Sequence, residues 1–160
     1  MERLLNSVGR MSRFINVIAG VAITFIMVLT VFDVILRAFR RPIVGTYELV
    51  AFSGAVVVGF AIPLTSWMRG HIYVDFFTAK LPKTARSAFN LITRCMGIGL
   101  FFLTGWNLIR VGMDLHASGE VSLTLQLPFY PVAYGMAVSC FVQCLVLVAD
   151  MVKISRGEYE

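Results

Sequence analysis

The chain has 160 residues, of which 58% are hydrophobic and only 14% are charged, and its formal net charge is +5. Soluble domains carry about 25% charged residues, so this composition excludes an ordinary soluble protein. The basic residues stand at the ends of long apolar segments. This placement predicts contact with lipid headgroups rather than with nucleic acid.

Long apolar segments occupy most of the chain, and each has about the 20 residues that a helix needs to cross a bilayer. They cover residues 14–36, 49–68, 89–109 and 129–149. The first is longer than the apolar core of a signal peptide and lacks a small-residue cleavage site, so we expect it to be retained. The sequence therefore predicts an all-α integral membrane protein, with residues 1–160 forming a single membrane domain of four transmembrane helices.

The head of the chain, residues 1–13, has apolar residues at helical spacing and basic residues opposite them. This pattern predicts a short amphipathic helix on the inner membrane surface, before the chain turns into the membrane at Gly9–Phe14. A frayed tail is the alternative.

Two charged residues end the first span. Asp33 and Arg37 are four residues apart, so their side chains can meet on one helix face. They form either a self-neutralising pair near the interface or a contact to another subunit or relay element.

The second span opens with an acidic residue and carries a stripe of small ones. Glu48 is a helix-start residue, a partner for Arg41 or Arg37, or a coupling-ion ligand. The small residues repeat every four positions and allow close helix packing, inside the chain or against a partner. They are Ala51, Ala55 and Gly59.

Residues 69–86 are too apolar for a free loop and too short to span the membrane. We expect an interfacial arm on the cytoplasmic surface that ends before Pro82. In the last two spans, Arg94 and Asp150 are expected to reach towards the headgroups, and Gln143 to hydrogen-bond a neighbouring helix.

The distribution of Lys and Arg predicts the orientation. Most of them lie in the head, in residues 69–86 and in the tail, so both termini are expected in the cytoplasm. The outward cluster of Arg37, Arg40 and Arg41 runs against this rule. The histidines, His71 and His116, lie outside the spans, and no catalytic, zinc or phosphate-binding motif occurs. The sequence predicts neither an enzyme nor a bound cofactor.

Several local patterns occur in a fixed order. They are Val31-Phe-Asp-Val-Ile-Leu-Arg37, Pro42-Ile43, Glu48-Leu49, Gly54 to Gly59, Arg69-Gly-His-Ile-Tyr-Val-Asp75, Leu81-Pro82, Ser122-Leu123, Leu127-Pro128 and Tyr134. Over about residues 14–140 this set resembles the small membrane subunit (DctQ-like) of TRAP transporters, the tripartite ATP-independent periplasmic transporters. Members often have a tryptophan early in the second span, where this chain reads Ala51-Phe52-Ser53.

The resemblance implies a location in the cytoplasmic (inner) membrane of a bacterium or archaeon. It also implies two protein partners: a large multi-span permease subunit with the transport pathway and sodium sites, and a periplasmic substrate-binding protein, commonly for an organic acid. The small subunit would scaffold the large one and help dock the periplasmic protein. Small multidrug exporters, membrane anchors of respiratory enzymes and channels are the rival classes.

Residue hypotheses follow from this resemblance. The face of Ala51, Ala55 and Gly59 is a candidate contact for the large subunit. Arg37, Arg40 and Arg41 are candidates for docking the periplasmic protein. His71 and Asp75 are expected to hold the start of the cytoplasmic arm.

Overall fold

The computed structural model describes residues 2–68 and 83–155. Its helices are α1 (Glu2–Ala38), α2 (Thr46–Trp67), α4 (Lys83–Ser118) and α5 (Tyr130–Ser155). All four are long and apolar enough to cross a membrane, which confirms the predicted all-α architecture. Most of the predicted arm lies outside the described residues, including His71 and Asp75; its last residues, 83–86, begin α4.

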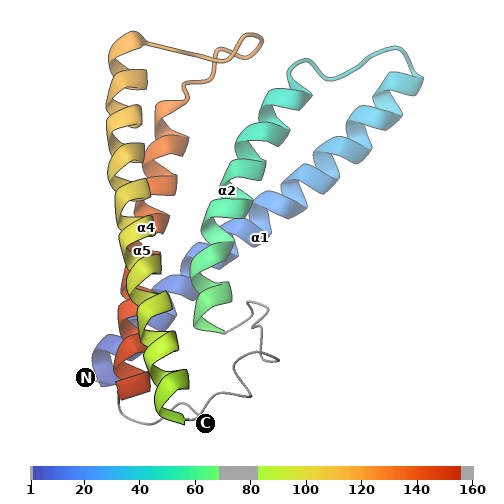
Figure 1. Cartoon of the computed structure of the whole chain (residues 1–160). Coiled ribbons are helices and arrows are strands. Elements are labelled where there is room, and N and C mark those ends of the chain that lie inside the picture. Colours follow the sequence, from blue (N-terminus) through green and yellow to red (C-terminus); the bar gives the residue numbers. More distant parts are fainter. Residues whose placement is uncertain (1, 69–82, 156–160) are drawn as a thin grey trace.

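Successive helices run in opposite directions (Figure 1). The α1–α2 connection (residues 39–45) and the α4–α5 connection (residues 119–129) lie at one end of the molecule, called here the connection end. The start of α1 and the close of α5 lie at the opposite, terminal end. The helices form two pairs, α1 with α2 and α4 with α5, which diverge towards the connection end (Figure 1).

Helix α5 is the centre of the bundle, because it contacts α1, α2 and α4. In the most apolar 18-residue stretch of α5, 56% of the residues are buried, whereas in the corresponding stretch of α4 only 6% are buried. The buried face of α5 includes small side chains such as Ala133, Ala137 and Ala149. Small residues let neighbouring helix backbones approach closely, which is a main source of helix association in lipid.

The N-terminal region differs from the sequence-based expectation, because α1 is one continuous helix from Glu2 to Ala38. Gly9 is buried against α2, and a Cβ at Gly9 would lie only 3.0 Å from Trp67 Cζ2. Ser12, Ile15 and Ala19 continue the buried face of α1. This packing explains why the helix continues through the expected turn. Its 37 residues span about 55 Å, more than a bilayer core of about 30 Å, and α1 is inclined to α4 (Figure 1).

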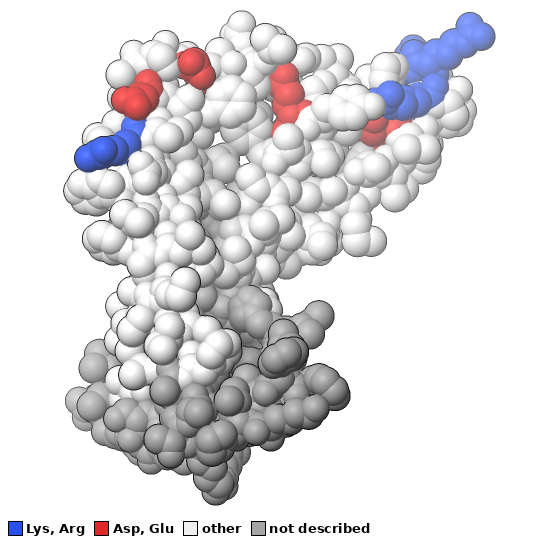
Figure 2. Space-filling model, viewed as in Figure 1, with Lys and Arg blue, Asp and Glu red and all other residues white. Residues whose placement is uncertain are grey.

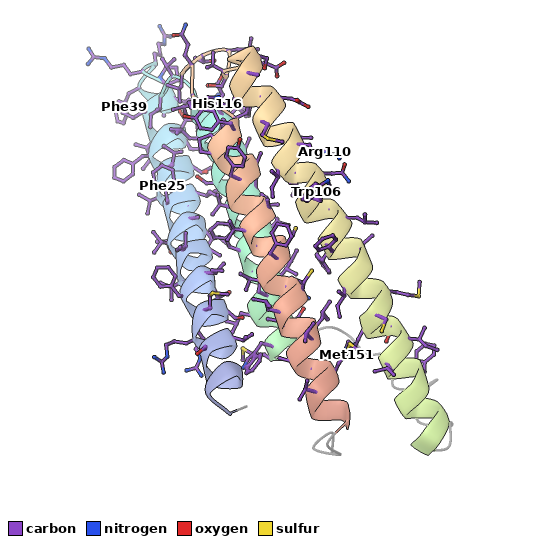
Figure 3. All side chains as sticks on the ribbon, turned by 90° about the vertical axis from the view of Figure 1, so that its left-hand side faces the viewer. Phe25, Phe39, Trp106, Arg110, His116 and Met151 are labelled. Carbon is purple, nitrogen blue, oxygen red and sulfur yellow. The ribbon has the colours of Figure 1, made fainter. Side chains whose placement is uncertain are left out.

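The outer faces of the bundle are apolar. Phe25 and Phe39 project from the α1 side of the molecule, away from the other helices (Figure 3). On α4, Leu100, Leu103 and Trp106 are likewise exposed. The charged side chains visible among the described residues collect at the connection end (Figure 2). Apolar side chains facing outwards need lipid or a protein partner as their environment.

Candidate functional site

The α1–α2 connection is fixed by the buried carboxylate of Asp33. Arg37 Nε donates a hydrogen bond to Asp33 Oδ2 at 2.7 Å, and the Ile43 backbone N–H donates to Oδ1 at 2.9 Å. Asp33 is 4% exposed, whereas the Arg37 side chain is 47% exposed. The predicted Asp33–Arg37 contact is therefore present, and the same carboxylate also anchors the chain that leads into α2.

The basic cluster lies on the outside of this connection. Arg40 and Arg41 are exposed, and Arg40 has a left-handed backbone with φ 59°. The Arg41 N–H donates to the Leu36 carbonyl at 2.9 Å, which closes the end of α1. Figure 2 shows basic side chains projecting at this corner of the molecule. The fold thus presents these two charges to the surroundings.

Glu48, in the first turn of α2, holds the α4–α5 connection. Its carboxylate accepts hydrogen bonds from Ser122 Oγ at 2.7 Å, the Thr124 N–H at 2.6 Å and the Leu125 N–H at 2.8 Å. The prediction that Glu48 opens the helix is confirmed. The structure shows the loop, rather than Arg37 or Arg41, as its partner. Sequence reasoning missed this contact because its members are more than 70 positions apart.

The α4–α5 connection is also stabilised by hydrogen bonds between its own residues. The Ser122 N–H donates to the Leu127 carbonyl at 2.9 Å, and the Leu127 N–H donates to Ser122 Oγ at 3.1 Å. Leu125 packs against Gly45, where φ is 80° and any Cβ would overlap the leucine side chain. Glycine is required at this position by both the backbone conformation and the close approach. The two connections are therefore held together at the connection end.

An apolar groove of about 700 Å³ opens between α2 and α5, next to the α4–α5 connection. Ala51 and Ala55 form part of its α2 wall, and Val132 and Ala133 part of its α5 wall. Phe52 and Phe129 also line it and stack on each other, with ring centroids 5.1 Å apart. Its polar lining residues, Tyr47, Glu48 and Ser122, lie at the connection end.

The third small residue of the predicted stripe has a different environment. Gly59 is buried against α5, where a Cβ would overlap Met136 Sδ. The carbonyl oxygen of Gly59 accepts a hydrogen bond from Ser139 Oγ at 2.5 Å. The structure therefore divides the stripe: Gly59 serves packing within the chain, while Ala51 and Ala55 line the open groove. A contact of these residues with a large subunit remains a prediction.

Two polar contacts join the helices towards the terminal end. Gln143 Nε2 donates to Ser66 Oγ at 2.7 Å, which confirms the predicted bond to a neighbouring helix. Arg94 Nε donates to Asp150 Oδ2 at 2.8 Å, with side chains only 13% and 14% exposed. We expected these two charges to reach separately towards headgroups; instead they pair across α4 and α5. Within residues 2–68 and 83–155, no group of three or more His, Cys, Asp or Glu is placed to hold a metal ion.

Comparison with known protein families gives a match over most of the chain. The model described as "Tripartite ATP-independent periplasmic transporters, DctQ component" matches residues 26–157. No curated protein and no solved structure matches the chain.

Proposed function

Because the chain belongs to the DctQ component family of tripartite ATP-independent periplasmic transporters, we propose that it is the small, non-catalytic subunit that scaffolds a large permease subunit. The family match over residues 26–157 is the observation that carries this proposal. In this proposal the large subunit carries the transport pathway and the sodium sites. The complex takes up an organic acid delivered by a periplasmic binding protein.

The polar contacts within the bundle support a scaffolding role. Asp33 and Glu48 each accept hydrogen bonds that hold a connection in place. The Arg94–Asp150 pair joins α4 to α5, and Gln143 joins α5 to α2. Polar groups at membrane depth often form transport sites, but here each of these side chains forms contacts with other groups of the same chain. Such contacts favour a rigid element against which another subunit moves.

We further propose that the connection end faces the periplasm and both termini face the cytoplasm. The excess of Lys and Arg in the head, in residues 69–86 and in the tail supports this orientation. Arg40 and Arg41 would then face the periplasmic binding protein. Exposed charge at such a surface steers a soluble partner of opposite charge and makes docking sensitive to salt.

The experiment that tests the scaffold is purification of the tagged full-length chain from native membranes in mild detergent, with mass spectrometry of the proteins that accompany it. We expect one much larger polytopic subunit in stoichiometric amount. In proteoliposomes, the large subunit with the periplasmic protein should transport only when this chain is present. Recovery of the chain alone as a self-associated dimer would contradict the proposal and favour a small exporter.

A further inference from the structure

The groove between α2 and α5 continues the contact between these two helices towards the connection end. One turn beyond Ala55, Gly59 packs against α5 and its carbonyl accepts the hydrogen bond from Ser139. Nearer the connection end the two helix pairs diverge (Figure 1), and Ala51, Ala55 and Ala133 line the open groove. Small side chains at such a position let the backbone of a further helix approach closely. The groove is therefore placed to extend the α2–α5 contact by one more helix.

The polar end of the groove carries a negative charge. The Glu48 carboxylate lines the groove and accepts hydrogen bonds from a hydroxyl and from two backbone N–H groups, all of which are neutral donors. None of the basic side chains that the structure describes forms an ion pair with Glu48. The N-terminus of α2 offsets part of the charge, but charged groups at the edge of a membrane core are typically paired with an opposite charge. The groove therefore favours an occupant with a cation at this end.

A phospholipid does not match this charge. An acyl chain could fill the apolar part of the groove, but the phosphate would then lie beside Glu48, and like charges repel. A transmembrane helix with one basic residue at its outer end supplies both parts that the groove requires. Its apolar face fits between α2 and α5, and the stem of a Lys or Arg packs along apolar surface while the charged group reaches the headgroup level. The charge therefore favours a helix over a lipid.

We propose that a transmembrane helix of the large permease subunit fills this groove, with its apolar face against Ala51 and Ala55 and one Lys or Arg at its outer end beside Glu48. This inference rests on the proposed function, because it needs the large subunit. It adds Glu48 to the contact between the subunits and leaves out Gly59, which packs within the chain. The carboxylate that holds the α4–α5 connection thus also binds the partner, so the partner helix docks against a connection that is already fixed.

A photo-crosslink in native membranes tests the position of the helix. A diazirine amino acid replaces Ala51 in the full-length chain, or replaces Leu103 as a control that is exposed on α4 and does not line the groove. We expect position 51 to form an adduct with one helix of the large subunit in higher yield than position 103. If the large subunit copurifies but position 51 labels only phospholipid or a second copy of the chain, this inference is wrong and the scaffold proposal stands. If no large subunit accompanies the chain, both are wrong.

The space in the groove is tested by a larger side chain. Ala51→Leu fills part of the groove, and it disturbs no buried position because Ala51 is exposed. We expect the affinity of the full-length chain for the purified large subunit in detergent to fall about tenfold, with unchanged unfolding of the chain itself. Ala117→Leu is the matched control, because Ala117 is exposed on α4 and does not line the groove. Equal affinity of the two variants would overturn the proposal.

The charge is tested by Glu48→Gln, which should lower the same affinity about tenfold. This variant also loosens the α4–α5 connection, so the control must loosen the connection and keep the charge. Leu125→Ala does so, because Leu125 packs against Gly45 and does not line the groove. We expect Leu125→Ala to lower the affinity less than about twofold. An equal loss in the two variants would show that the carboxylate acts only through the connection, and would overturn the pairing.

The cation on the partner is tested by a double-mutant cycle. The basic residue at the outer end of the crosslinked helix is replaced by Gln. With the wild-type chain this replacement should lower the affinity about tenfold, whereas with Glu48→Gln it should lower the affinity less than about twofold, because the paired charge is already gone. Additive losses, or a crosslinked helix without a Lys or Arg at that end, would overturn the proposal.

Discussion

Ser139 on α5 donates a hydrogen bond from Oγ to the backbone oxygen of Gly59 on α2, at 2.5 Å. The cause lies one turn further along α2, where Pro63 has no N–H. In a helix the N–H of residue 63 would bond to the carbonyl of residue 59, so proline leaves that oxygen without its donor. A serine from a neighbouring helix can supply the missing bond within a membrane. Pro63 therefore leaves the Gly59 oxygen free to accept a hydrogen bond, and Ser139 donates that bond from α5.

Replacing Ser139 with alanine should lower the free energy of unfolding in detergent by about 1 kcal/mol. The loss should be smaller in a Pro63→Ala background, because the restored N–H of residue 63 then binds the Gly59 oxygen. A double-mutant cycle measures this coupling. Thr30→Ala is the control, since the Thr30 hydroxyl bonds only within its own helix. Additive effects of the Ser139 and Pro63 substitutions would contradict this account.

Replacing Glu48 with glutamine should loosen the α4–α5 connection. Glutamine keeps one oxygen where the carboxylate uses two to accept three hydrogen bonds, so at least one donor of the connection loses its acceptor. We expect about tenfold faster amide hydrogen exchange at Thr124 and Leu125, whereas the exchange rates at the centre of α2 should not change. Glu120→Gln changes an exposed acid of the same connection and should leave exchange unaltered. The same acceleration in both variants would argue against the Glu48 contact.

The Arg94–Asp150 pair should show strong coupling. Each side chain is largely buried, so Arg94→Ala removes the arginine partner of a largely buried carboxylate and should destabilise the protein by about 3 kcal/mol. Removing both charges together should cost less than the sum of the single replacements. Unfolding in detergent measures all three variants. If the double variant lost as much free energy of unfolding as the two single variants together, the two charges would not be coupled and this account would be wrong.

Charge removal at Arg40 and Arg41 tests the docking proposal. Arg40→Gln with Arg41→Gln should slow association of the periplasmic protein about tenfold at low salt and flatten the dependence of the rate on ionic strength. Surface binding kinetics on the reconstituted complex give both quantities. Arg110→Gln, an exposed arginine on α4, should change neither by a comparable amount. Unchanged kinetics in the double variant would remove Arg40 and Arg41 from the docking surface.

The sequence by itself determined the four spans and the local contacts. Apolar length alone identified each span, and a separation of four residues was enough to predict the Asp33–Arg37 pair. The ordered motifs indicated the family that the model match shows. These features depend on residues close together in the chain, and composition and periodicity report such features directly.

The tertiary structure alone decided how the helix faces are used. It shows that Glu48 binds a connection more than 70 positions away along the chain and that Arg94 pairs with Asp150. It also shows that Gly59 packs against α5, whereas Ala51 and Ala55 line the open groove. In a membrane protein, apolar residues face both lipid and neighbouring helices, so hydropathy does not mark the buried face as it does in water. Which face turns inwards depends on how side chains from distant segments fit together, and only the assembled bundle brings them into contact.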